Sequence, residues 1–253
     1  MSDLEERIAR AASARGGELK TLLADPAKEV LEALLRNPNL TEDDLGILLR
    51  RKNLPSEIIR QIAETDKLAR NYRIKLAMVL NPHTPRLISM SLLKFLYLFD
   101  LVTVGLQPAV PTEIKKLAEE AIISRMKQIP LGQKMTLARR ASGRVVAALL
   151  AEGNQQVLSL ALNNPFLTEA HILKVLALDE LEPRVVEGLA RHEKWSLRYG
   201  IRLALVRHPL TPLARALAFL PDLAPADLRD IAADRRLPPS LRQYIQQYIQ
   251  PQR

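Results

Sequence analysis

The sequence contains no cysteine, and this absence excludes disulfide bonds, thiolate metal sites, cysteine-held iron–sulfur clusters and cysteine nucleophiles. Aromatic residues are also scarce, at 4% of the chain, and only 9 of the 253 residues are glycine. Leu, Ala, Glu, Arg and Ile dominate instead, which is a composition typical of helices rather than sheets. The composition therefore predicts an all-α protein.

A secretory signal is also missing, because residues 1–7 carry acids where a signal peptide needs a basic stretch before an apolar run. We therefore expect a cytoplasmic protein. Residues 87–106 form the longest apolar run, nearly the length that a bilayer requires, with only Lys94 and Asp100 charged. Those charges would lie near mid-membrane, so a buried helical hairpin is the preferred interpretation and a membrane span the alternative.

Motifs for catalysis or cofactor binding are absent as well. The adjacent glycines Gly16 and Gly17 lack the strand and the lysine of a phosphate loop. The four histidines lie in separate segments without the spacing of a helical zinc site, and they are His83, His171, His192 and His208. We therefore expect no metal, no cofactor and no enzymatic activity.

An internal duplication is the strongest pattern that is present. When each residue is paired with the one 127 positions later, roughly a quarter of these aligned positions are identical. Examples of identical pairs are Asn37-Pro38 with Asn164-Pro165, Leu40-Thr41-Glu42 with Leu167-Thr168-Glu169, Tyr72 with Tyr199, and Asp100-Leu101 with Asp227-Leu228. The sequence thus predicts two helical-repeat halves, residues 1–126 and 127–253, stacked as one continuous solenoid.

Within each half, a shorter pattern marks the expected helix starts: an Asn-Pro or Pro, then Thr, Ser or Pro followed by an acid. Proline ends one helix, the hydroxyl caps the next, and the acid favours its positive end. Amphipathic stretches about ten to fifteen residues long lie between these marks, so we expect eight or nine short helices per half in an α-solenoid. Residues 101–104 alone would suggest a strand, but their aligned stretch favours a helix.

The repeated turn, as at Asn37, Asn53, Asn81 and Asn164, resembles that of bacterial HEAT-like solenoids, in particular the leucine-rich repeat variant proteins. The resemblance implies a right-handed stack of short helices, some of them 3₁₀. It is specific to architecture and not to activity. The iron–sulfur cluster of one member of that family does not carry over, because this chain has no cysteine.

The charge is strongly positive, at +9, and it favours an acidic partner. Residues 1–127 hold 20 basic and 17 acidic residues, and residues 128–253 hold 17 and 11, so the second half is the better candidate for contact with a polyanion. Basic residues also recur at aligned positions: Arg7 with Lys134, Lys67 with Lys194, Lys75 with Arg202, and Lys115 with Arg242. Such rows either contact phosphates or only keep the protein soluble.

Two further features are candidates for contacts. Phe95 to Phe99 concentrates aromatic residues, and core packing is the preferred interpretation over an exposed patch. Trp195 either anchors a partner or packs under the adjoining helix. The candidate binding residues are Lys134, Arg139, Arg140, Arg144, Lys194, Trp195, Arg198 and Arg202.

These observations favour a non-enzymatic scaffold that binds a protein partner through its extended surface. The alternative is a nucleic-acid binder that uses the basic rows of the second half. A third possibility is an enzyme whose cleft unites a buried carboxylate, Trp195 and several arginines.

Overall fold

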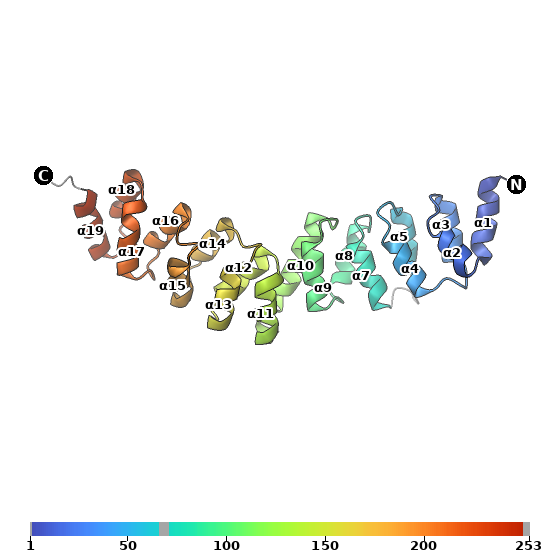
Figure 1. Cartoon of the computed structure of the whole chain (residues 1–253), viewed down its shortest axis with the longest axis horizontal. Coiled ribbons are helices and arrows are strands. Elements are labelled where there is room, and N and C mark those ends of the chain that lie inside the picture. The colour runs from blue at the N-terminus through green and yellow to red at the C-terminus, as the bar shows by residue number, and fades with distance from the viewer. Residues whose placement is uncertain (1, 66–70, 250–253) are drawn as a thin grey trace. The chain divides into compact units, whose positions relative to one another are not determined.

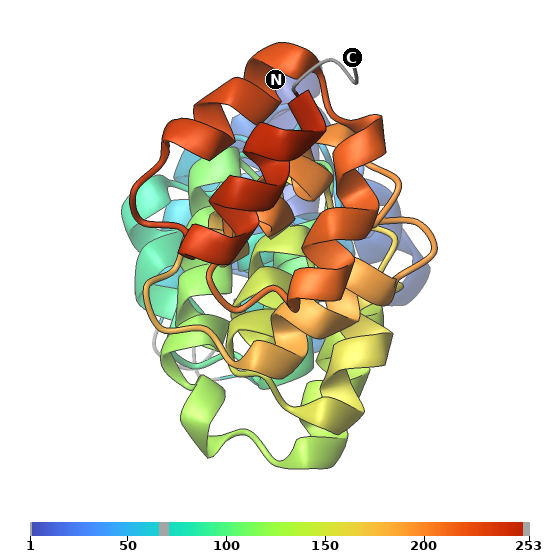
Figure 2. The same cartoon turned by 90° about the vertical axis from the view of Figure 1, so that its left-hand side faces the viewer.

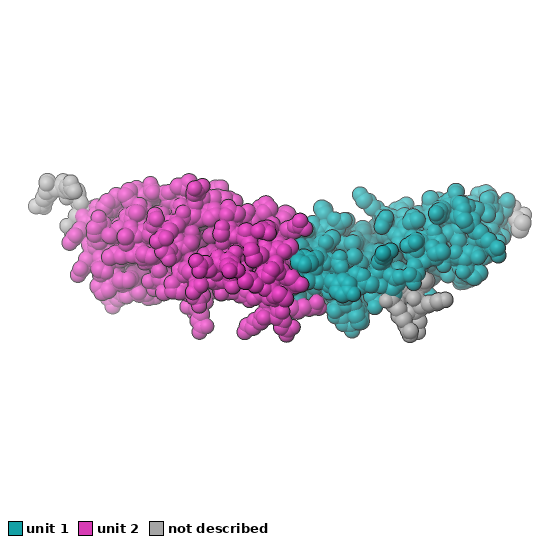
Figure 3. Space-filling view, turned by 60° about the horizontal axis from the view of Figure 1, so that its bottom comes forward, with its two compact units in different colours: residues 1–124 teal, residues 125–253 magenta. Residues whose placement is uncertain are grey.

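The computed structural model describes residues 2–65 and 71–249 (Figure 1). In these residues the chain is all-helical, with eighteen short α-helices, two 3₁₀ turns and no strand. The fold divides into two compact units, unit 1 (Met1–Ser124) and unit 2 (Arg125–Arg253), which are coloured separately in Figure 3. The predicted all-α class is confirmed.

Unit 1 holds nine α-helices in its described residues. They are α1 (Asp3–Ser13), α2 (Gly16–Leu22), α3 (Lys28–Leu35), α4 (Glu42–Leu49), α5 (Ser56–Glu64), α7 (Tyr72–Leu80), α8 (Arg86–Leu93), α9 (Leu98–Leu106) and α10 (Thr112–Ser124). The helices form two rows (Figure 1). In one row α1 packs on α3, α3 on α5, and α8 on α10; in the other row α4 packs on α7 and α7 on α9. Apolar side chains fill the space between the rows, among them Leu31, Leu45 and Ile59.

Unit 2 also holds nine α-helices in its described residues. They are α11 (Leu131–Arg140), α12 (Gly143–Ala151), α13 (Gln155–Leu162), α14 (Glu169–Leu176), α15 (Pro183–Arg191), α16 (Tyr199–Arg207), α17 (Leu213–Phe219), α18 (Pro225–Ala233) and α19 (Pro239–Ile249). The 3₁₀ turns are η1 (Met126–Gln128) and η2 (Leu220–Asp222). Here α11, α13 and α15 form one row and α12, α14 and α16 the other, while α18 lies against α19, both red in Figure 2.

The long apolar run at residues 87–106 is divided between α8 and α9, which are separated by residues 94–97. The potential strand at residues 101–104 is helical and belongs to α9, as its aligned stretch indicated. Across residues 2–65 and 71–249, every helix is too short or too polar to cross a lipid bilayer.

The residues at the helix starts act as the sequence predicts. The Thr41 hydroxyl accepts a hydrogen bond from the Asp44 N–H, and the Asp44 carboxylate accepts one from the Thr41 N–H, which closes a capping box on α4. In unit 2, Thr168 caps α14 in the same way, with His171 in place of the acid. Both caps supply partners to amides that a helix leaves unbonded.

The asparagine of the Asn-Pro turn has a structural role that the sequence did not reveal. The buried Asn37 amide donates to the carbonyls of Ala11 and Ala14, at 2.8 and 3.0 Å, and its oxygen accepts from the Asn39 N–H. Each such side chain therefore ties its turn to the end of a helix more than twenty residues earlier.

Two other asparagines make the same clamp. Asn164 donates to the carbonyls of Ala138 and Ala141, at 2.9 and 3.2 Å, and is buried. Asn81 donates to the carbonyls of Leu49 and Arg51, at 2.7 and 3.0 Å. In this way buried helix ends find the hydrogen-bond partners that they need.

Candidate surface for partner binding

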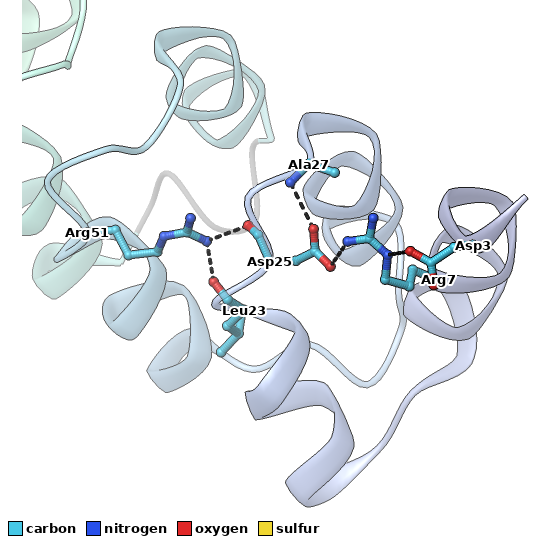
Figure 4. A network of polar contacts seen from close by, with 6 residues as sticks. All are labelled: Asp3, Arg7, Leu23, Asp25, Ala27 and Arg51. Carbon is cyan, nitrogen blue, oxygen red and sulfur yellow. Dashed lines mark hydrogen bonds and ion pairs between the residues drawn. The ribbon is translucent and has the colours of Figure 1, made fainter.

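The recurring basic residues Arg7 and Lys134 both lie in ion pairs. Arg7 Nη1 is 2.6 Å from Asp25 Oδ2, and this carboxylate also accepts from the Ala27 N–H (Figure 4). Lys134 Nζ is 2.7 Å from Glu152 Oε2, and its side chain is only 15% exposed. Both residues therefore hold helices together inside their own unit.

Lys75 and Arg202 are also engaged. Lys75 Nζ lies 4.4 Å from the centre of the Phe95 ring. Arg202 Nη1 is 2.7 Å from Asp222 Oδ2. Asp222 is at the position aligned with Phe95. The aligned cations Lys75 and Arg202 therefore contact an aromatic ring in unit 1 and a carboxylate in unit 2 at the same aligned position.

The remaining recurring pairs give a similar result. Lys115 Nζ donates to the Pro108 carbonyl at 3.4 Å, and Arg242 Nε donates to that of Leu237 at 3.2 Å. Lys67 lies outside the described residues.

Trp195 belongs to the core of unit 2. Its side chain is 2% exposed, and its indole N–H donates to the Leu162 carbonyl at 2.7 Å. The interpretation that it packs under a neighbouring helix is confirmed, and it is not an exposed anchor for a partner. Lys194 covers this ring, with Nζ 4.1 Å from its centre, and the neighbouring Arg198 is exposed.

The basic cluster at the start of unit 2 is mixed in character. Arg139 and Arg140 are exposed at the end of α11, whereas Arg144 on α12 is half-buried and has an interaction partner. Of the eight predicted binding residues, Lys134, Arg144, Lys194, Trp195 and Arg202 are thus engaged within the protein. Arg139, Arg140 and Arg198 remain exposed.

The charge difference between the units is larger than the division at residue 127 suggested. Unit 1 holds 18 basic and 17 acidic residues, a net +1, and unit 2 holds 19 and 11, a net +8.

The aromatic segment from Phe95 to Phe99 lies mainly at the surface. Phe95 is 50%, Tyr97 68% and Phe99 43% exposed, and only Leu96 is buried. The preferred prediction of core packing was therefore wrong for the three aromatic rings. The segment alternates because it forms the turn into α9, so one of its faces covers the core while the other meets solvent. We call Phe95, Tyr97 and Phe99 the aromatic patch.

The aromatic patch is tied to α7 through Tyr72. The rings of Tyr72 and Tyr97 stack with their centres 4.3 Å apart, and the Tyr72 hydroxyl donates to Asp100 and accepts from the Tyr97 N–H. Burial, followed by the hydrogen bond to Asp100, raises the pKa of Tyr72 to about 12. Tyr97 is therefore tied to α7 through both its ring and its backbone N–H.

Unit 2 repeats this arrangement without the second ring. The Tyr199 hydroxyl donates to Asp227 and accepts from the Ala224 N–H, at the positions aligned with Asp100 and Tyr97. The hydrogen bond to Asp227 raises the pKa of Tyr199.

A groove runs beside the patch along α7. One cavity of about 730 Å³ is bounded by α4, α7 and Tyr97, with Ile47, Glu42 and Asp43 in its wall. A second cavity of about 390 Å³ is bounded by Leu49, Leu76, Leu80 and other apolar side chains. The two cavities share Arg50, Tyr72, Arg73 and Ala77, so they adjoin, and we call them together the α7 groove.

Neither the α7 groove nor its cations emerged from the sequence. Arg50, Lys52 and Arg73 line it. Arg50 and Lys52 belong to the short basic run at residues 50–52, but Arg73 lies more than twenty positions later, so the sequence does not show that the three share one groove. The aligned stretch of unit 2 held the missing signal, because Ala177, Asp179 and Gly200 stand at the same three positions there. The groove is therefore indicated by a difference between the aligned stretches and not by residues that recur in both.

The sequence and the structure were compared with known protein families, curated proteins and solved structures, and none of them matches.

Proposed function

We propose that this chain is an internally duplicated α-solenoid of the HEAT-like kind that acts as a non-enzymatic scaffold and binds a protein partner through unit 1. The duplication is supported by helices that start at aligned residues, such as α4 and α14 at Glu42 and Glu169 and α7 and α16 at Tyr72 and Tyr199. The two-row packing within each unit supports the repeat fold.

The observation that carries the binding role is the exposed aromatic patch. Large apolar side chains that gather at the surface of a soluble protein mark interaction sites, and aromatic residues dominate the energetics of such contacts. The positions aligned with Phe95, Tyr97 and Phe99 hold Asp222, Ala224 and Ala226, so unit 2 does without the rings. The patch is thus better explained by binding than by the needs of the fold.

Replacing the patch with the residues of unit 2 tests the proposal. The triple variant Phe95→Asp, Tyr97→Ala and Phe99→Ala keeps the Tyr97 backbone N–H that bonds Tyr72, and it offers Lys75 an acid like the one that Arg202 has. The matched control removes three exposed apolar side chains of unit 2, namely Leu197→Ala, Phe166→Ala and Leu213→Ala.

The measurement is capture of proteins from a cell lysate, with and without nuclease, quantified by mass spectrometry. We expect wild type and the control to retain the same partner in similar amounts. The patch variant should retain at least about tenfold less of that partner. A partner that all three proteins retain equally would contradict the proposal.

Nucleic-acid binding by unit 2 is the alternative, and its net charge of +8 favours it. The recurring basic residues of unit 2 argue against it, because Lys134 and Arg202 are in ion pairs. Loss of every captured partner on nuclease treatment would favour this alternative over the scaffold role.

A further inference from the structure

We propose that the α7 groove of unit 1 binds an acidic, partly apolar peptide segment of the partner, whose carboxylates pair with Arg50, Lys52 and Arg73. This inference rests on the proposed scaffold function and adds the chemistry of the partner. It places the anion-binding site in the unit with the smaller net charge.

The three cations are the first argument. Arg50, Lys52 and Arg73 are exposed, and their side chains have no hydrogen bond or ion pair with any described residue. The neighbouring Arg51, by contrast, donates to the carbonyls of Leu23 and Asp25 (Figure 4). The cations of the groove are therefore available to a ligand, whereas Arg51, which lies between two of them in the sequence, is engaged.

The aligned positions supply the second argument. Unit 2 has a cavity of about 440 Å³ between α14 and α16, lined by Ala177, Asp179 and Ala204, which align with Arg50, Lys52 and Ala77. The hollow is thus present in both units, but its basic residues stand at different positions. In unit 2 they are Arg207 and Arg236, aligned with Leu80 and Ala109, and Asp179 lines the cavity beside them. Arg236 is paired with Asp234, whereas the three cations of the α7 groove have no such partner among the described residues. Because α14 and α16 pack without those charges, packing of these helices does not require them.

The apolar wall supplies the third argument. The smaller cavity of the groove is formed largely by Leu49, Leu76, Leu80, Pro82 and Ala109, and none of the described residues that line it is acidic. Its volume of about 390 Å³ lies within the range of sites that enclose small ligands or side chains. An apolar side chain of the peptide fills this cavity, while the carboxylates beside it meet the cations at its rim.

Charge also sets the direction of the peptide. Glu42 and Asp43 line the larger cavity but not the smaller one, so the larger cavity carries both signs and the smaller only positive charge. Glu42 already accepts a hydrogen bond from the Asn71 amide, whereas Asp43 is exposed. The acidic part of the peptide therefore lies over the smaller cavity, and a basic or polar part lies over the larger one.

The same carboxylates disfavour a nucleic acid in this groove. A continuous phosphate backbone would meet Glu42 and Asp43, and like charges at a contact lower affinity. A phosphate backbone also has no apolar group to fill the cavity beside Leu76 and Leu80. A peptide satisfies both parts of the groove.

The test uses the full chain and arrays of short synthetic peptides. The first array combines Asp or Glu with Leu or Phe in every order, a second replaces each acid with Lys, and a third replaces each Leu or Phe with Ser. We expect retention on the first array only, and retention that falls as ionic strength rises. If no peptide of the first array is retained above the other two, the inference is wrong.

Variants then locate the site. The triple variant Arg50→Ala, Lys52→Ala and Arg73→Ala is compared with Arg15→Ala, Lys20→Ala and Arg36→Ala, which removes the same charge from exposed positions elsewhere in unit 1. We expect the groove variant to bind the retained peptides about tenfold more weakly, and the control to lose less than about twofold. Circular dichroism melting of both variants checks that each still folds.

Equal affinities of the two variants would overturn the inference, and so would RNA or duplex DNA that binds the groove more tightly than the peptides do at the same salt. The proposed function fails separately. If lysate capture depends on the aromatic patch but not on the groove cations, the scaffold role stands and only the peptide inference is lost.

Discussion

The α4–α7 region of unit 1 and the α14–α16 region of unit 2 differ mainly where they meet solvent. Both have a capping box, a tyrosine bonded to an aspartate, and a hollow between the helices. Arg50, Lys52 and Arg73 of the first are Ala177, Asp179 and Gly200 in the second. The comparison teaches that the shared residues serve packing and capping. The residues that differ are therefore the better candidates for a binding role specific to one unit.

The asparagine clamp gives the largest expected effect with which to test this comparison, because both units use it. We expect Asn37→Ala and Asn164→Ala each to lower the free energy of unfolding by about 2–3 kcal/mol, since each leaves buried carbonyls without a donor. Urea titration followed by circular dichroism measures the change.

The control for the clamp is Asn163→Ala, an exposed residue beside Asn164, which should cost less than about 0.5 kcal/mol. A loss in one unit without a similar loss in the other would show that the clamp is not an equivalent support in both.

The ion pairs at Arg7 and Lys134 give a smaller, graded effect. Asp25 is 7% exposed and binds both Arg7 and the Ala27 N–H, whereas Glu152 is 25% exposed and binds Lys134. We expect Asp25→Ala to cost about 2 kcal/mol and Glu152→Ala about 0.5–1 kcal/mol in unfolding free energy. Equal costs, measured by the same urea titration, would mean that burial does not distinguish these two carboxylates.

The stacked tyrosines give the smallest effect and concern ionisation. Because the pKa of Tyr72 is raised to about 12, its neutral form is favoured in the fold. The resulting stability is complete below the ordinary tyrosine pKa near 10 and is lost as the pH rises towards 12. We expect Tyr97→Ala to lower the pKa of Tyr72, because it exposes the Tyr72 ring to water.

The Tyr72 pKa is measured by NMR titration with ring-labelled tyrosine. Tyr97→Phe is the matched control, since it keeps the stacked ring and should leave the pKa raised. An unchanged pKa in Tyr97→Ala would show that the Tyr97 ring does not supply the burial that raises the pKa of Tyr72.

The sequence predicted the all-helical class and the helix starts, because proline, hydroxyl and acidic residues act within one turn of the chain. The aligned stretch of unit 2 also indicated that residues 101–104 are helical, and they belong to α9. Local signals of this kind need no knowledge of distant contacts.

The features that the sequence could not predict depend on contacts between residues that are distant in the chain. The sequence alone does not show that Lys134 has a partner, because Glu152, just after the end of α12, is brought beside it only by the fold. Phe95 reads as core because hydropathy does not show which face of a turn meets solvent. Arg50 and Lys52 are close in sequence, but Arg73 comes from a separate segment, so only the fold brings the three groove cations together.

The asparagine clamps also have a consequence for how each unit opens. Asn37, Asn81 and Asn164 each hold carbonyls that precede them by more than twenty residues, so a turn that loosens also releases the end of an earlier helix. Amide protons at Ala11 and those around Asn37 should therefore exchange with solvent together rather than one by one. Local unfolding of a unit would then proceed in sequence, from one pair of helices to the next.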